Sequence, residues 1–262
     1  MSLIITIFNE VLYRPLFNGL VFLYNIIPGH DFGIAIILLT LIIRLLLYPL
    51  FQKSIKSQQS LMILQRKIKE IQKKYKDDKE KQARAMMELY KIHKVNPMSG
   101  CLPILIQLPI LYAFFRVLWT GLDPSKLSNL YWFINSPGLI DPIFLGIIDL
   151  SKKSPLLAIL AGLSQFVQSK MMAPKNNYPK INHKLDLTRT MSTQMTYLMP
   201  LLTIFIAWSL PAGLPLYWLS LTLFGILQQY ITLKKKTSEA PKDPLLSNER
   251  RGPTGQASKQ NG

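Results

Sequence analysis

Five long apolar segments restrict what this 262-residue chain can fold into. A helix that crosses the hydrocarbon core of a bilayer needs about 20 residues, because each residue adds about 1.5 Å. Hydrophobic residues make up 49% of the chain and the mean hydropathy is positive, which is unusual for a soluble domain. We therefore predict an all-α integral membrane protein with a core of five transmembrane helices. The predicted spans are residues 33–52, 99–120, 155–172, 195–210 and 213–233.

The distribution of charge between these segments predicts their orientation. Residues 53–94 hold thirteen basic and five acidic residues, whereas residues 121–153 hold three of each. Residues 175–189 hold four basic residues and one acidic residue. Because positive loops stay on the cytoplasmic side, we expect the N-terminus outside and the C-terminus inside, in a bacterial plasma membrane. The net charge of +17 is spread between apolar blocks, so we expect no specific binding of nucleic acid.

We predict that the five-helix core occupies residues 31–233, and the segments before and after it differ from it in composition. Residues 3–27 are apolar but carry polar and charged residues through their middle. We expect residues 1–30 to contain an amphipathic helix in the outer interface, with a sixth span as the alternative. Residues 234–262 are basic and rich in Pro, Gly and Ser, and we expect a disordered cytoplasmic tail.

The basic inner segment 54–96 has a helical pattern of its own. Leu61, Leu64, Ile68, Ile71 and Tyr75 follow one another at alternating steps of three and four residues. This spacing is typical of a packed helical seam, and the polar run at 76–78 interrupts it. We predict an antiparallel helical hairpin in the cytoplasm, and the alternative is a solvated charged helix without a partner.

The sequence offers no recognisable catalytic apparatus. It contains no phosphate loop of the GxxxxGK type, no HExxH, no GxSxG and no CxxC. Cys101 is the single cysteine, and the three histidines lie in separate segments without metal-ligand spacing. We expect a protein that is not an enzyme and that holds no metal and no cofactor.

Arg44 is the exceptional residue, because it lies inside the first predicted span. A charge at mid-helix costs roughly 2.5 to 3.5 kcal/mol on insertion scales, and arginine stays protonated. Arg44 must therefore face water, polar groups or a counter-charge, or else reach the inner headgroups along its own stem. Polar residues of three spans predict a wet cavity around it, although each could instead bond a neighbouring helix. The predicted lining residues are Thr40, Tyr48, Gln107, Ser164, Gln165 and Gln168.

Several extended strings resemble the YidC insertases, a family with relatives in mitochondria and thylakoids. NPMSGCLPILIQLPIL at 96–111 resembles the entry to that family's second core helix. MPLLTIFIAWSLPAGLPLYW at 199–218 is similar to its turn between the fourth and fifth helices. Arg44 matches the arginine of its first core helix, and YRPLFN at 13–18 is similar to its interfacial helix. The resemblance covers about residues 8–233 in the same order.

The resemblance implies a five-helix core around a hydrophilic groove that is open to the cytoplasm and to lipid. It implies that the chain assists nascent membrane proteins into the bilayer, with Arg44 as the groove arginine and Gln107, Gln165 and Gln168 as lining. Nascent membrane proteins and lipid are the implied partners, with the ribosome and the Sec translocon as further candidates. The chain resembles the short form, since no soluble segment is large enough for a periplasmic domain.

Two other classes of function remain open from the residues alone. An intramembrane arginine could bind an anionic solute in a small-solute transporter or channel, although we find no internal repeat of the kind transporters carry. The basic segment could instead make the chain a membrane-anchored tether for a ribosome or nucleic acid.

Overall fold

The computed structural model describes residues 2–96, 98, 102–121, 130–173 and 194–238. Its secondary structure is almost entirely helical, in agreement with the predicted all-α class. Cys101, the inner loop 175–189 and the tail beyond residue 238 lie outside the described residues.

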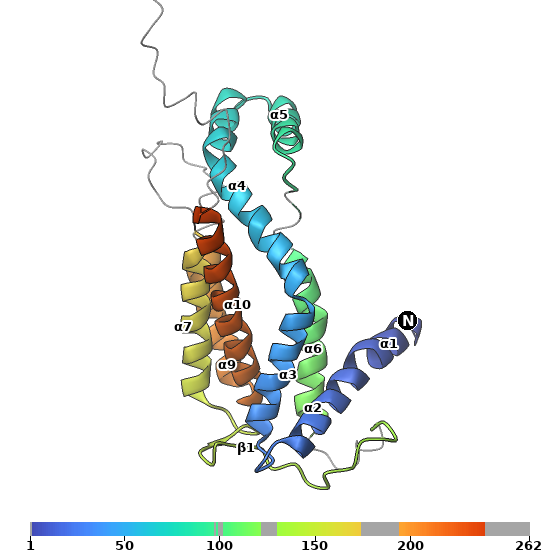
Figure 1. Cartoon of the computed structure of the whole chain (residues 1–262). Coiled ribbons are helices and arrows are strands. Elements are labelled where there is room, and N and C mark those ends of the chain that lie inside the picture. Colours follow the sequence, from blue (N-terminus) through green and yellow to red (C-terminus); the bar gives the residue numbers. More distant parts are fainter. Residues whose placement is uncertain (1, 97, 99–101, 122–129, 174–193, 239–262) are drawn as a thin grey trace, which may run out of the picture.

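The main body is an upright bundle of helices (Figure 1). It contains α3 (Phe32–Leu46), α6 (Leu102–Gly121), α7 (Pro155–Met171), α9 (Met199–Ser209) and α10 (Gly213–Ser238), and a π-helical turn, η4 (Gln194–Leu198), leads into α9. α10 packs against α3 and α7, and α7 packs against α9. The Asp31 and Ser154 side chains accept hydrogen bonds from the first turns of α3 and α7 and so define where these helices begin. α10 continues five residues beyond the predicted span and takes in the start of the basic tail.

The first predicted span, 33–52, is not a single straight helix. α3 ends at Leu46, and α4 (Tyr48–Lys74) leaves it at an angle of 68°. Pro49 lies in the first turn of α4, where its ring and missing N–H prevent the helix of α3 from continuing. In the part of the chain that the structure describes, this bent pair satisfies the length and hydropathy expected of a span, and no single helix does.

Beyond the bundle, α4 and α5 (Lys79–Ile92) pack against each other. Leu64, Ile68 and Leu89 form a small buried apolar cluster between them. The turn between the two helices contains Asp78, whose carboxylate accepts a hydrogen bond from the backbone N–H of Lys81 at 2.9 Å. The helical segment predicted at 54–96 therefore begins earlier, at Tyr48, directly after the bend.

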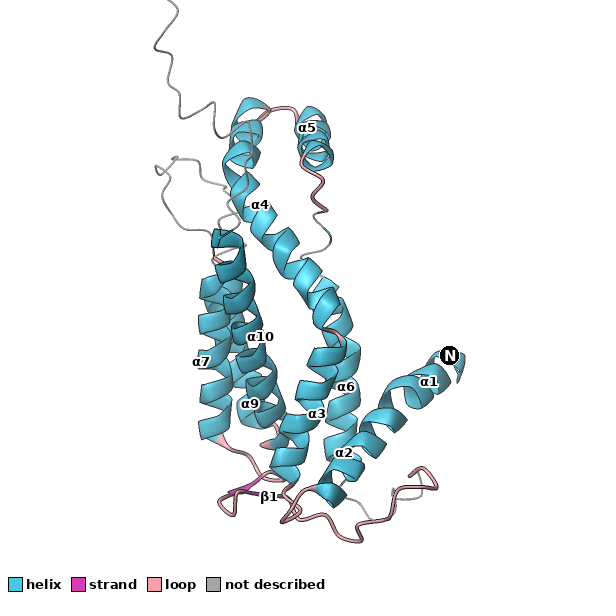
Figure 2. Cartoon of the chain, viewed as in Figure 1, coloured by secondary structure: helices cyan, strands magenta, loops and turns pink. Residues whose placement is uncertain are grey.

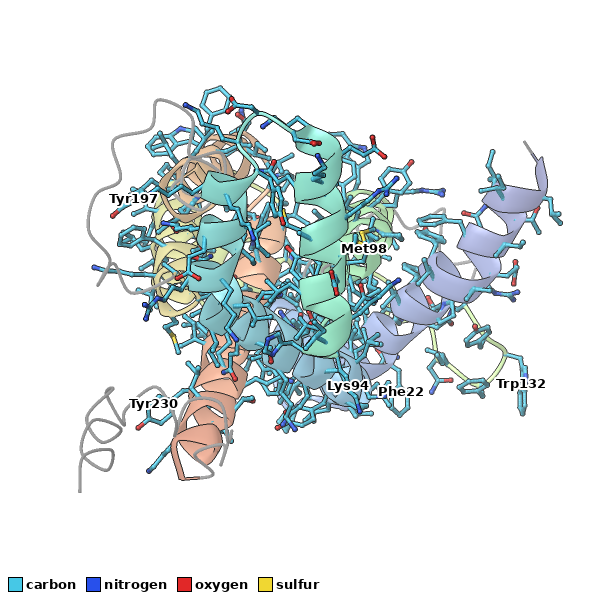
Figure 3. The ribbon with its side chains drawn as sticks, turned by 90° about the horizontal axis from the view of Figure 1, so that it is seen from above. Phe22, Lys94, Met98, Trp132, Tyr197 and Tyr230 are labelled. Carbon is cyan, nitrogen blue, oxygen red and sulfur yellow. The ribbon has the colours of Figure 1, made fainter. Side chains whose placement is uncertain are left out.

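The N-terminal helix has three parts, α1 (Ser2–Phe8), the π-helical turn η1 (Asn9–Tyr13) and α2 (Arg14–Ile26). α2 packs on α3 and α6, whereas α1 extends away from the bundle (Figures 1 and 3). The polar residues in its middle have tertiary partners. Asn9 accepts a hydrogen bond from Arg116 at 2.8 Å, and Asn18 accepts one from the backbone N–H of Tyr131 at 2.6 Å.

A loop lies across the end of the bundle opposite to α5 (Figure 2). It contains two short antiparallel strands, β1 (Ile143–Phe144) and β2 (Ile148–Asp149), which the sequence did not predict. Phe144 packs so closely on Gly33 that a methyl group there would overlap its ring. The backbone N–H of Ala212 donates to the carbonyl of Lys152 at 2.7 Å, so the loop also holds the turn between α9 and α10.

Candidate functional site

Arg44 lies near the C-terminal end of α3 and its side chain is buried, with only 8% of its surface exposed. Nη2 donates to the carbonyl oxygen of Leu221 on α10 at 3.3 Å, and the guanidinium lies 4.2 Å from the centre of the Phe51 ring. Nε finds no hydrogen-bond partner in the part of the chain that the structure describes. In the described ranges no carboxylate forms an ion pair with Arg44, so among these residues the positive charge is buried without a counter-charge.

Gln168 approaches Arg44 from α7 through a gap that Gly225 of α10 leaves open. A methyl group at Gly225 would overlap the amide nitrogen of Gln168, and it would lie 3.5 Å from Nη2 of Arg44. Because the glycine has no side chain, α10 brings an amide and a guanidinium together at this level.

Tyr217 belongs to the same site, although sequence reasoning did not include it. Its ring is fully buried and stacks on Phe114 at 4.2 Å, and its hydroxyl accepts a hydrogen bond from Gln107 at 2.6 Å. Tyr217 lies one helical turn before Leu221, the residue whose carbonyl binds Arg44, and therefore on the same face of α10. The Arg44 cluster, as we call it, thus comprises Arg44, Gln107, Gln168 and Tyr217. In the sequence, Tyr217 stands out only as a tyrosine that follows the LPAGLP turn inside an apolar helix.

The other predicted lining residues make different contacts. Thr40 is buried and bonds the carbonyl of Ile36 on its own helix at 2.7 Å. Ser164 likewise bonds Ala161 at 2.8 Å, and Gln165 accepts a hydrogen bond from Thr203 of α9 at 2.5 Å. The hydrogen bonds of these three side chains are thus made within their own helix or to a neighbouring helix.

The predicted span 33–52 would put Tyr48 on the same helix as Arg44, one turn further on, and the structure contradicts this. The helix ends at Leu46, so the expected spacing of four residues along one helix is broken by the bend. Tyr48 contributes its backbone instead, since its carbonyl oxygen accepts a hydrogen bond from Gln228 of α10 at 3.2 Å.

The outer surface of the bundle is strongly apolar, in contrast to the Arg44 cluster. α9 carries a shallow hollow of about 660 Å³ that is lined by Leu201, Leu202, Phe205, Trp208 and neighbouring residues. Tyr197 and Tyr230 point outward from the periphery, and Trp132 projects from the loop at the opposite end (Figure 3). A buried charge inside a bundle with an apolar outside suits a lipid environment.

The described residues hold no group of three or more His, Cys, Asp or Glu side chains that could bind a metal ion. The groups present at the Arg44 cluster offer hydrogen bonding and charge attraction. Guanidinium and amide groups can bind carboxylates, carbonyls and water, but none of them is a nucleophile or a general base at neutral pH.

Comparison with known proteins gives one consistent family. The family profile described as 60Kd inner membrane protein matches residues 22–239. The chain is 37% identical over 226 residues to the membrane protein insertase YidC of Fusobacterium nucleatum, and the match covers 86% of this chain and 98% of that protein. It is 36% identical over 222 residues to the YidC insertase of Geotalea daltonii, covering 84% of this chain but 37% of that protein.

A solved structure, described as an active YidC insertase with its first transmembrane domain resolved, is similar in fold and sequence. The TM-score is 0.54 with 30% sequence identity, and the match covers 83% of this chain and 46% of that one. The chain thus spans nearly the whole of one relative and under half of several longer ones. On the extent of these matches, the chain belongs to the YidC family of membrane protein insertases.

Proposed function

We propose that this chain helps transmembrane segments enter the lipid bilayer, and that the Arg44 cluster is the polar surface of a groove through which their polar flanks cross. Family membership supports the class of activity. The observation that carries the mechanism is the buried Arg44 guanidinium, which has no ion pair among the described residues and an unpartnered Nε. A buried charge of this kind is costly unless a partner arrives.

The obstacle to insertion lies in the flank and not in the apolar helix. Burial of an apolar helix in lipid is favourable, whereas the peptide groups of a short polar flank lose their water on the way across. Arg44 can attract an acidic or polar flank into the bundle while the apolar helix moves out into lipid. A membrane potential that is positive outside favours an acidic flank by about 2.3 kcal/mol per charge per 100 mV.

The proposed topology has five spans with the N-terminus outside and the C-terminus inside. α6, with 20 residues, and α10, with 26, reach about 30 Å and 39 Å at 1.5 Å per residue. The thirteen basic residues of 53–94 place the hairpin of α4 and α5 in the cytoplasm by the positive-inside rule. α1 exposes Leu3, Ile4 and Ile5 and would lie in the outer interface. Nascent membrane proteins would be the substrates, and the hairpin and basic tail could be reached by a ribosome or the Sec translocon.

Reconstitution of the purified chain in liposomes tests this function. The substrate is a single apolar helix with a short acidic N-terminal flank, and the readout is the protection of that flank from protease. Wild type should give protection well above empty liposomes, and Arg44→Ala should lower it about tenfold, the factor for loss of one hydrogen bond to a charged group. Arg84→Ala removes the same charge from an exposed position in α5 and should have little effect.

Arg44→Lys separates charge from geometry, because lysine keeps the positive charge but lacks the planar fork. It should restore part of the protection. Equal protection with wild type and Arg44→Ala would refute the charge attraction, and no protection above empty liposomes would refute the insertase function.

A further inference from the structure

Four glutamines outside the Arg44 cluster carry amide atoms that are buried and find no hydrogen-bond partner among the described residues. They are Gln52 and Gln59 on α4 and Gln228 and Gln229 on α10, which we call the glutamine band. Gln59, Gln228 and Gln229 expose only 6%, 2% and 7% of their surface. The Oε1 atoms of all four and Nε2 of Gln59 are buried and have no hydrogen-bond partner in the described part of the chain.

The band continues the polar interior from the Arg44 cluster toward the hairpin. Gln228 follows Leu221, the residue whose carbonyl binds Arg44, by seven positions, so the two lie on one face of α10 about 10 Å apart. Its Nε2 donates to the carbonyl of Tyr48 at 3.2 Å, which joins α10 to the first residue of α4. Gln52 and Gln59 follow Tyr48 by four and eleven positions, one and three turns further along α4.

Such a concentration of unsatisfied groups points to a ligand. Buried polar atoms in proteins are nearly always hydrogen-bonded, because an orphaned one carries its full desolvation cost. Among the described residues, five of the seven buried side-chain atoms without a partner belong to this band, and another is Nε of Arg44. Gln52, Gln59 and Gln228 thus lie on the faces of α4 and α10 that meet at Tyr48, Gln229 is the chain neighbour of Gln228, and the seventh atom is Nε of Arg14 on α2.

The chemistry of the band differs from that of Arg44. A guanidinium only donates hydrogen bonds and carries a charge, whereas four of the five orphaned atoms are neutral amide oxygens that accept. Their natural partners are N–H and O–H groups. An extended peptide flank presents unpaired backbone N–H groups, and uncharged polar side chains add further donors.

We propose that the glutamine band is a second subsite, which binds the backbone N–H groups and uncharged polar side chains of a substrate flank between the cytoplasm and Arg44. This inference rests on the proposed insertase function. The two subsites then bind different flanks. Arg44 binds acidic flanks, and the amides of the glutamine band bind uncharged polar ones.

The test compares two single-span substrates in proteoliposomes, one with a Ser- and Gln-rich flank and one with an Asp-rich flank. The variant Gln59→Met/Gln229→Met keeps side-chain volume and removes two amides. Protection of the uncharged flank should fall about fivefold for each neutral hydrogen bond to the substrate that is lost, and protection of the acidic flank should change little. Gln58→Met is the matched control, because the Gln58 amide already bonds the hydroxyl of Ser54 at 3.2 Å.

Thermal stability separates a binding role from a structural one. Removal of orphaned amides should leave the Tm of the double variant unchanged or raise it, because no bond within the protein is lost. A lower Tm with an equal loss of both substrates would overturn the proposal, and so would unchanged protection of both. Wild type that inserts neither substrate would instead overturn the insertase function.

Disulfide trapping tests the same subsite without the methionine variants. With Cys101→Ser and Gln229→Cys in the chain, a cysteine in the uncharged flank of the substrate should cross-link more than one at the centre of its apolar helix. Equal or reversed cross-linking would overturn the proposal.

Discussion

Arg44 shows how single residues define the interior of this protein. Its charge is buried against the Phe51 ring and one distant carbonyl, so no described group neutralises it. A cation over an aromatic face gains about 0.5 to 2 kcal/mol, which is less than the cost of burying the charge. In the proposed mechanism, a polar or acidic group of the substrate relieves the remaining cost of burying this charge.

Gly225 is a positioning residue in this account, because a side chain there would displace Gln168 from Arg44. Gly225→Ala should lower insertion of an acid-flanked substrate about fivefold through the loss of one amide contact. In a chain that already carries Gln168→Ser, the same substitution should have no further effect. Additive effects in this double-mutant cycle would show that the two residues act independently.

The candidate site could be predicted from the sequence only in part. Arg44 is recognisable because a charge within an apolar run is rare, and Gln107 and Gln168 stand out as amides in apolar helices. Tyr217 could not be assigned in this way, since its role depends on stacking with Phe114, about 100 residues away. Gln165 looked equivalent to Gln168 but is turned about 60° from it around α7, and its amide oxygen accepts a hydrogen bond from Thr203 of α9 instead.

At the scale of elements, the bend between α3 and α4 is the main departure from the expected fold. The apolar pattern runs on from Arg44 through Phe51, so hydropathy alone gives one span. Pro49 is the local signal for the break, but the 68° angle depends on packing against α10, including the bond from Gln228 to Tyr48. The bend directs α4 away from the bundle and carries the hairpin with it.

The hairpin of α4 and α5 should depend on its small apolar cluster. Leu64→Ala should destabilise the packing of the two helices by about 2 to 4 kcal/mol, because it leaves a cavity against Ile68 and Leu89. Hydrogen exchange of α5 amides would report the opening. Ile63→Ala is the control, since Ile63 is 58% exposed and its truncation should change exchange by less than about 0.5 kcal/mol. Equal effects of the two variants would contradict the packing.

The loop across the opposite end should be ordered by Asp149 over a wide pH range. The hydrogen bond from the Ser151 hydroxyl and then the Lys152 ammonium lower the pKa of Asp149 from 3.8 to about 2. A carboxylate with a lowered pKa stabilises the fold above its ordinary pKa, and this contribution is lost as the pH falls through about 2. Ser151→Ala should move the titration of Asp149 upward in an NMR experiment. A wild-type midpoint near 3.8 would contradict the contacts.

At the scale of the whole molecule, the two ends of the bundle are built differently. One end is covered by the loop that packs Phe144 on Gly33 and binds the α9–α10 turn. Toward the other end lie the Arg44 cluster, the glutamine band and the charged hairpin. This polarity matches a protein that receives polar segments from one side only.

Thiol labelling should reveal the orientation of these ends in the membrane. In a Cys101→Ser chain, an impermeant maleimide added to intact cells should label Ser136→Cys in the loop. Lys76→Cys in the hairpin should be labelled only after the membrane is opened, because the positive-inside rule places it in the cytoplasm. The reverse pattern would invert the proposed topology.

Cross-linking of a substrate flank to the Arg44 cluster tests the central claim most directly. A photoreactive residue at position 168 faces Arg44, and the same residue at position 163 of α7 replaces an exposed leucine. With an insertion intermediate whose acidic flank carries a detectable tag, position 168 should cross-link the flank, and Arg44→Ala should reduce this product. Position 163 should cross-link lipid or the apolar helix. Flank cross-links that are equal at both positions, or unaffected by Arg44→Ala, would contradict passage of the flank past Arg44.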